Sequence, residues 1–108
     1  MNFVGIRVAA VSADQKTFLG YGTYLGDFLN PGLAEYYVEA IKKHPEIPEG
    51  EKEPLIAKVR AGESPFGINP KIRLDDGREV WGAECWWGAA DAFVVNGYAK
   101  KYGAPEIY

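Results

Sequence analysis

The sequence predicts an α+β protein, with an antiparallel sheet of four to five strands and two helices, about residues 31–44 and 54–61, packed on one face. Three observations carry this prediction. Two apolar segments at the start of the chain are joined by turn residues, two amphipathic segments follow, and residues 71–88 hold a strong hairpin signal. At 108 residues the chain is long enough to bury a core without disulfides, so we expect one domain over residues 1–108.

The first two strands are predicted at the N-terminus. Residues 3–11 alternate weakly between apolar and other side chains, residues 12–15 have turn chemistry, and residues 16–25 return as a second strand. Gly20 and Gly22 leave one face of this second strand nearly bare. We interpret this as strand curvature against a packed helix, the alternative being a ring or ligand that lies on the backbone.

The two helices are predicted from capping residues and apolar spacing. Asn30 can cap the first helix, and Pro45 ends its amphipathic run. Pro54 is expected to open the second, shorter helix. Residues 45–54 between them are predicted to form an exposed connector, or alternatively a mobile acidic arm that meets a basic partner. The acidic residues of this connector are Glu46, Glu49, Glu51 and Glu53.

The hairpin of residues 71–88 turns at Asp76 and Gly77, since Asp followed by Gly supplies left-handed backbone. A two-residue loop would mix apolar and charged side chains on both faces of the hairpin. A longer loop with a glycine bulge separates an apolar row from a charged row, and we therefore predict the bulged register. Its cross-strand pairs are Ile72 with Val80 and Arg73 with Glu79.

The second strand of this hairpin is predicted to continue to residue 87. Alternation then places Trp86 on the face of Ile72, and Trp81 and Trp87 on the opposite face. A strand with aromatic residues on both sides either lies between two layers or leaves a ring exposed for a partner. Gly82 inside the run indicates a bulge or a close backbone approach.

The C-terminal segment has two interpretations. Residues 89–95 form either a short helix that ends at Asn96 and Gly97, or one strand of a hairpin that turns there. We prefer the short helix, followed by a strand or an extended tail.

Composition excludes several classes of function. The formal net charge is −3 and no basic block is present, which argues against general nucleic-acid binding. One cysteine excludes an internal disulfide, and one cysteine with one histidine excludes the usual structural zinc sites. We expect no metal and no cofactor. The chain shows neither a leader pattern nor an apolar run of membrane-spanning length, so a cytoplasmic protein is expected.

Catalysis has little support in the sequence. Cys85 is the strongest nucleophile candidate, but Glu84 beside it would raise the pKa of the thiol, and His44 sits at a distant helix end. A glycosidase-like carboxylate pair is not favoured, because Asp75 and Asp76 are explained by the turn itself. We predict that the protein is not an enzyme, the alternative being a small enzyme that uses Cys85 or Glu84.

Binding fits the residues better, because Trp and Tyr are the residues that anchor interfaces. One predicted role is a small inhibitor or modulator that presents an aromatic surface to a larger protein, and the alternative is a protein that holds a small molecule or nucleotide in an aromatic pocket. A flat exposed patch would indicate the first, and a concave pocket the second. Self-association through the aromatics or a free sheet edge is a further alternative. The candidate binding residues are Glu84, Trp86, Trp87, Trp81, Tyr21 and Tyr24.

In size, acidity and aromatic content the chain resembles the small accessory proteins that bacteriophages and mobile elements use against host machinery, including anti-CRISPR proteins. The resemblance is one of general character and assigns no residues. It implies inhibition of a larger protein partner.

Overall fold

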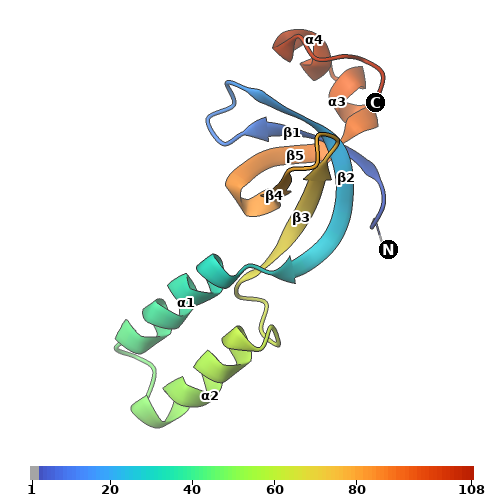
Figure 1. Cartoon of the computed structure of the whole chain (residues 1–108). Helices are drawn as coiled ribbons and strands as arrows, with labels where there is room; N and C mark the ends of the chain where they lie inside the picture. The colour runs from blue at the N-terminus through green and yellow to red at the C-terminus, as the bar shows by residue number, and fades with distance from the viewer. Residues whose placement is uncertain (1–2) are drawn as a thin grey trace. The chain divides into compact units, whose positions relative to one another are not determined.

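The computed structural model describes residues 3–108, and the chain divides into two compact units. The sheet unit comprises the chain up to Gly26 together with Pro70–Tyr108, and the helical unit comprises Asp27–Asn69. Figure 1 shows the sheet with two short C-terminal helices, and the helical pair that interrupts it in the sequence. The α+β class and the antiparallel sheet of five strands are confirmed.

The sheet has the order β4-β3-β2-β1-β5. Its strands are β1 (Arg7–Ser12), β2 (Phe18–Leu29), β3 (Ile68–Leu74), β4 (Glu79–Trp81) and β5 (Cys85–Ala89). The edge strands β4 and β5 are joined by a single 3-10 turn, η1 (Gly82–Glu84). The edges of a flat sheet of this width lie about 19 Å apart, whereas such a turn covers about 8 Å. The sheet therefore rolls up, and β2 is visibly bent (Figure 1).

The predicted register of the β3–β4 hairpin is confirmed. Ile72 lies opposite Val80, and Arg73 lies opposite Glu79. The left-handed Gly77 (φ 95°) donates its N–H to the carbonyl of Leu74 at 2.9 Å, as the glycine bulge requires.

The prediction that this strand continues to residue 87 is wrong. The chain leaves β4 after Trp81, turns through η1 and returns as β5, which pairs with β1. A Cβ on Gly82 would lie 2.4 Å from Nε1 of Trp87 and 2.9 Å from Cβ of Pro70, so only glycine lets the indole lie against this backbone. The turn also reverses the predicted faces of the tryptophans. Trp87 packs with Cys85 on the core, and Trp86 points outward.

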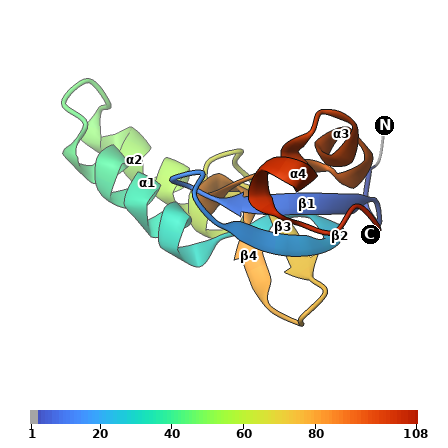
Figure 2. The ribbon, with the colours of Figure 1, turned by 90° about the horizontal axis from the view of Figure 1, so that it is seen from above.

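The sheet unit has a core on each face of the sheet. One core contains Val8, Ala10, Ile72 and Leu74, with Trp87 and Cys85 against it. The other contains Ala9, Tyr21 and Ala90, with Phe18 and Phe93 against it. The second core is covered by α3 (Ala90–Val95) and α4 (Tyr98–Tyr102), which lie over β1 in Figure 2.

The C-terminal prediction is half right. The short helix before Asn96 is confirmed as α3, but residues 98–102 form helix α4 rather than a strand or tail. Gly97 adopts a left-handed conformation (φ 82°) and lets the chain start a new helix at once. The Asn-Gly pair therefore separates two helices instead of two strands.

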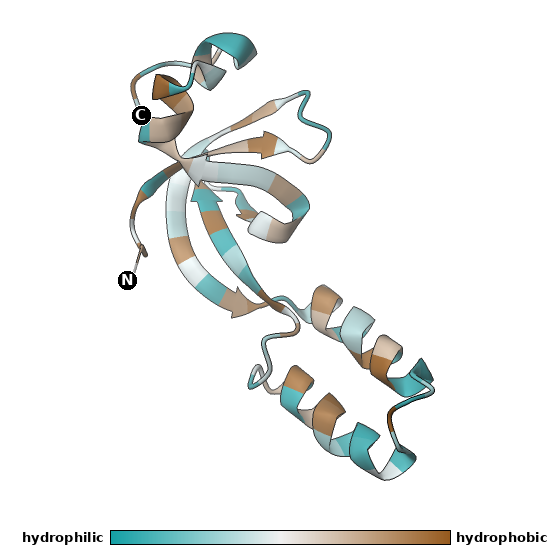
Figure 3. Cartoon of the chain, turned by 180° about the vertical axis from the view of Figure 1, so that it is seen from behind, coloured by the Kyte–Doolittle hydropathy of each residue, from teal (hydrophilic) through white to brown (hydrophobic). Residues whose placement is uncertain are grey.

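The helical unit contains α1 (Pro31–Lys43) and α2 (Glu49–Arg60). The Asn30 side chain accepts a hydrogen bond from the N–H of Leu33 at 3.3 Å, which confirms the predicted cap. Apolar residues, brown in Figure 3, recur along both helices. Their buried residues, Ala34, Val38, Ile56 and Val59, form a core between the two helices.

The connector prediction is wrong for most of residues 45–54. Helix α2 begins at Glu49, so Pro54 lies inside the helix instead of opening it. Lys52, only 8% exposed, explains the early start: its Nζ donates to Oε1 of Glu49 and to the carbonyl of Lys42, each at 2.8 Å. This lysine ties the first turn of α2 to the end of α1.

An ion pair joins the β3–β4 turn to β1. The Arg7 guanidinium donates to both carboxylate oxygens of Asp75, at 2.7 and 2.5 Å. These hydrogen bonds, and then the positive charge of Arg7, lower the pKa of Asp75 below its ordinary value.

We expect this pair to add its full stability above the pKa of Asp75 in the unfolded chain, about 3.9, and to lose it as the pH falls from there through the lower folded value. Asp75 is 57% exposed, so we expect about 0.2–1 kcal/mol. Unfolding measured from pH 7 to pH 2 should show an Asp75→Asn deficit at pH 7 that disappears in acid. A deficit of constant size across this range would contradict the assignment.

Candidate functional site

The three tryptophans have different environments. Trp86 is 60% exposed, and its Nε1–H donates to the carbonyl of Ala13 at 3.1 Å. Trp87 is half-buried and stacks on Tyr24, with ring centroids 5.3 Å apart. Trp81 is half-buried under Nζ of Lys71, which lies 5.2 Å from its ring centroid. Only Trp86 therefore presents its ring to solvent.

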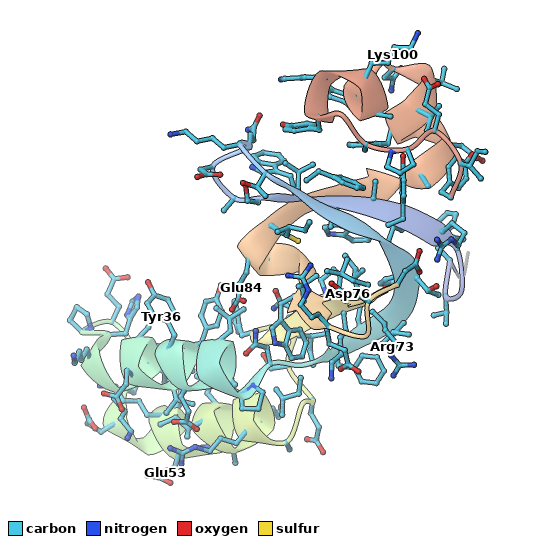
Figure 4. All side chains as sticks on the ribbon, turned by 45° about the horizontal axis from the view of Figure 1, so that its top comes forward. Tyr36, Glu53, Arg73, Asp76, Glu84 and Lys100 are labelled. Carbon is cyan, nitrogen blue, oxygen red and sulfur yellow. The ribbon has the colours of Figure 1, made fainter. Side chains whose placement is uncertain are left out.

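The other predicted binding residues do not join Trp86. Tyr21 is buried, and its hydroxyl donates to the carbonyl of Pro105. Burial, with a smaller contribution from Glu106, raises the pKa of this phenol. Tyr24 packs against the core with Trp87. Glu84 is exposed on the turn η1, as Figure 4 shows.

Trp86 forms one wall of a concave groove of about 240 Å³ on the outer face of β1 and β5, closed on the other side by α3 and α4. Small residues form its floor, aromatic residues form its walls, and two residues with amide side chains also line it. The floor comprises Ala9, Gly88, Ala89 and Ala92, the walls comprise Trp86, Phe93, Tyr98 and Tyr102, and the amides are those of Gln15 and Asn96. Val11 and Trp87 complete the lining.

The groove walls are held by contacts among themselves. Phe93 stacks on Tyr98 and on Tyr102, with centroids 6.0 and 6.2 Å apart. The hydroxyl of Tyr102 donates to the carbonyl of Gln15 at 2.8 Å, which ties α4 to the β1–β2 loop. Gln15 has a left-handed backbone (φ 61°), rare for this residue type. These contacts between protein groups fix the positions of the groove walls.

The ammonium group of Lys101 lies beside the aromatic wall of the groove. Nζ of Lys101 lies 5.9 Å from the ring centroid of Tyr98 and 5.5 Å from that of Tyr102. These cation–π contacts hold the lysine beside the aromatic wall.

The acidic residues predicted for the connector lie mainly on a helix. Glu49, Glu51 and Glu53 belong to α2, and Glu46 precedes it. Glu49 is paired with Lys52. Three of the four predicted carboxylates therefore lie on a helix.

The thiol of Cys85 is not activated. Burial, and to a lesser extent Glu84, raises its pKa above the ordinary value. Its Sγ lies 3.4 Å from the carbonyl oxygen of Trp81, to which it donates. His44 ends helix α1 in the other unit. Within residues 3–108, no three His, Cys, Asp or Glu side chains are grouped so that they could hold a metal ion.

The helical unit has a second hollow of about 240 Å³, lined by α1, α2 and the segment after α2. Tyr37, Ile41, Leu55 and Phe66 are among its lining residues. None of the predicted binding residues lines it. No helix in the described part of the chain is long and apolar enough to cross a membrane.

Sequence reasoning missed most of the groove. Phe93, Tyr98 and Tyr102 come from the segment whose structure the sequence left open, and the amides of Gln15 and Asn96 belong to residues interpreted only as turns. The spacing of four between Tyr98 and Tyr102 is the one available signal, since it places two rings on one side of a helix.

With this geometry in hand, we compared the chain with known proteins. No protein-family model matches it, and no curated protein or solved structure is similar to it.

Proposed function

We propose that the protein is a non-enzymatic binding protein whose aromatic groove receives one apolar side chain of a protein partner. The observation that carries the proposal is the groove beside Trp86. The side chain of Trp86 is 60% exposed, whereas the other two tryptophans of the sheet unit are half-buried. A large exposed ring next to an apolar hollow is typical of an interface anchor.

The size of the groove favours a side chain over a whole ligand. Pockets that enclose small molecules usually measure about 300–1,000 Å³, and this groove measures about 240 Å³. One phenyl, phenol, indole or branched aliphatic group fits this volume. Because Trp86 is held by Ala13 and the opposite wall by Gln15, binding need not order these side chains.

The role that we propose for this binding is inhibition or modulation of a larger partner in the cytoplasm. A small protein that anchors one side chain and covers its surroundings blocks that surface for other molecules. Trp86 and the groove support this role, and Glu84 on the neighbouring turn η1 offers an exposed carboxylate to a basic group at the rim.

A second candidate function is the binding of a planar small molecule such as a nucleobase. The groove is concave, which is the feature that favours a ligand. Its two carboxamides, Gln15 and Asn96, can each donate and accept hydrogen bonds at the edge of a base. The limited volume is the argument against a whole nucleotide.

The test is an NMR titration of the purified protein with defined probes. N-acetylphenylalaninamide represents a partner side chain, and adenosine represents a base. We expect N-acetylphenylalaninamide to shift the backbone amides of Gln15, Ala92 and Asn96, with a Kd on the order of 1 mM. Trp86→Ala should weaken this binding at least about fivefold. The matched control is Tyr36→Ala, which removes a 69% exposed aromatic from the helical unit and should leave the affinity unchanged.

The outcomes separate the candidates. Tighter binding of adenosine than of the side-chain probe would favour the small-molecule function. Both candidate functions would be contradicted if neither probe shifted the amides at the groove, or if the shifts persisted unchanged in Trp86→Ala.

A further inference from the structure

We propose that the partner binds as an extended strand that pairs with the outer edge of β5 and places one of its side chains in the aromatic groove. This inference rests on the proposed function, because it names the form in which the anchoring side chain arrives. It uses the position of β5 at the end of the sheet order, where one side pairs with β1 and no strand within residues 3–108 pairs with the other.

The direction of the backbone groups on β1 follows from two hydrogen bonds. The N–H of Ser12 donates to the carbonyl of Thr17, and the carbonyl of Ile6 accepts from the N–H of Tyr24. Both bonds point toward β2. Because the groups of a strand alternate in direction, the even-numbered residues of β1 face β2 and the odd-numbered residues face β5.

The same alternation determines which backbone groups of β5 point away from β1. The odd-numbered Ala9 and Val11 lie opposite Gly88 and Trp86, so these pairs carry the hydrogen bonds between β1 and β5. The intervening residues of β5, namely Cys85, Trp87 and Ala89, then direct their N–H groups to the outer edge. Over residues 3–108, no backbone hydrogen bond outside the sheet is donated by any of these three. Such a row of free groups is the template on which an added strand forms.

The two edges of the sheet are not alike. β4 has three residues, and its Glu79 forms ion pairs with Lys71 at 3.0 Å and Arg73 at 3.2 Å, which are charges that discourage strand addition. β5 has five residues, Cys-Trp-Trp-Gly-Ala, without charge or proline. An open hollow also borders β5 on the side of η1, lined by Gly82, Ala83 and Cys85 among others. The edge strand without charged residues or proline, β5, is thus the one next to the groove.

A strand added to this edge brings its side chains to the groove. Trp86 and Gly88 share the outer face of β5 and both line the groove. A Cβ on Gly88 would meet no atom within 4 Å, so the space above this glycine is open. Side chains on adjacent strands lie about 5 Å apart, and a large side chain of the partner can therefore lie over Gly88 against the ring of Trp86. The partner segment is thus an uncharged strand with a large apolar residue at alternate positions.

The test uses a displayed library of random ten-residue peptides as the probe. We expect the protein to select peptides with large apolar residues spaced two apart. In the best peptide, methylation of single backbone nitrogens should reduce affinity at every second residue, because only alternate N–H groups of a strand face β5. A protein variant tests the same pairing from the other side. Ala89 has φ −56° and ψ 133°, which proline adopts without strain, so Ala89→Pro removes one outward N–H and should weaken binding about fivefold or more.

Three results would overturn the inference. The first is selected peptides with apolar spacing of three and four, or no selection at all. The second is an N-methyl scan without period two together with unchanged affinity of the Ala89→Pro variant. The third is a dimer of the purified protein, measured by light scattering, that Ala89→Pro dissociates, since a second copy would then occupy the edge. If Trp86→Ala weakens peptide binding while Ala89→Pro does not, the strand is rejected and the proposed function stands.

Discussion

Replacement of Gly22 by alanine is expected to lower the free energy of unfolding of the sheet unit by about 3 kcal/mol or more. Gly22 lies on β2 where β3 crosses at close range. A Cβ at this position would lie 2.3 Å from the carbonyl oxygen of Arg73 and 2.9 Å from Cα of Leu74. Both neighbours are backbone atoms of β3, so they cannot move aside as a flexible side chain would. Chemical denaturation followed by tryptophan fluorescence reports this unit, because all three tryptophans belong to it.

The matched control for this substitution is Gly50→Ala. Gly50 lies in the first turn of α2, and a Cβ there meets no atom within 4 Å. Alanine favours helix over glycine, so this variant is expected to be neutral or more stable by up to about 1 kcal/mol. A Gly22→Ala protein as stable as the wild type would show that β2 and β3 do not approach as closely as described.

Alanine substitution of the adjacent tryptophans Trp86 and Trp87 is expected to have different effects, on binding for Trp86 and on stability for Trp87. Trp87 stacks on Tyr24, lies over Gly82 and packs against the core of the sheet unit. Removal of a fully buried Trp side chain costs about 3–5 kcal/mol. Because Trp87 is half-buried, we expect Trp87→Ala to lower the free energy of unfolding by about 2–3 kcal/mol.

Trp86→Ala provides the comparison. Its ring is 60% exposed and makes one hydrogen bond, to Ala13, so the expected loss of stability is about 1 kcal/mol or less. The same variant is expected to lose binding at the groove. Equal destabilisation by the two substitutions would contradict the separation of the pair into a core residue and a surface residue.

Local rules predicted the parts of the fold that depend on neighbours in sequence. The register at Ile72 and Val80 followed from the sorting of apolar and charged side chains, and the start of α1 followed from Asn30. Gly82 was correctly identified as a site of close approach, but the sequence alone does not say what approaches. The approaching group is the indole of Trp87, and this contact turns the chain away from β4.

The remaining errors share one physical cause, which is competition between local signals and packing. Asn96 and Gly97 suit a hairpin as well as a helix end, and burial of Ala99, fully inaccessible in α4, favours the helix. Pro54 suits the first turn of a helix, yet α2 starts earlier because Lys52 ties Glu49 to Lys42. The groove could not be foreseen for the same reason. It joins the β1–β2 loop to α4 through Tyr102 and Gln15, a contact across 87 positions of the chain.

The interruption of the sheet unit by the helical unit has a consequence for the order of folding. β2 and β3 are neighbours in the sheet but are separated by residues 30–67, and closing a flexible loop of that length costs on the order of 3 kcal/mol in its length-dependent entropy. The helical unit forms from contacts close in sequence. Once formed, it holds its own ends together, since the N–H of Asn30 donates to the carbonyl of Gly67 at 2.7 Å. A helical pair that folds first therefore brings β3 close to β2 and lowers the entropy cost of their pairing. Slower refolding is expected from any substitution that weakens the hydrogen bond between Asn30 and Gly67.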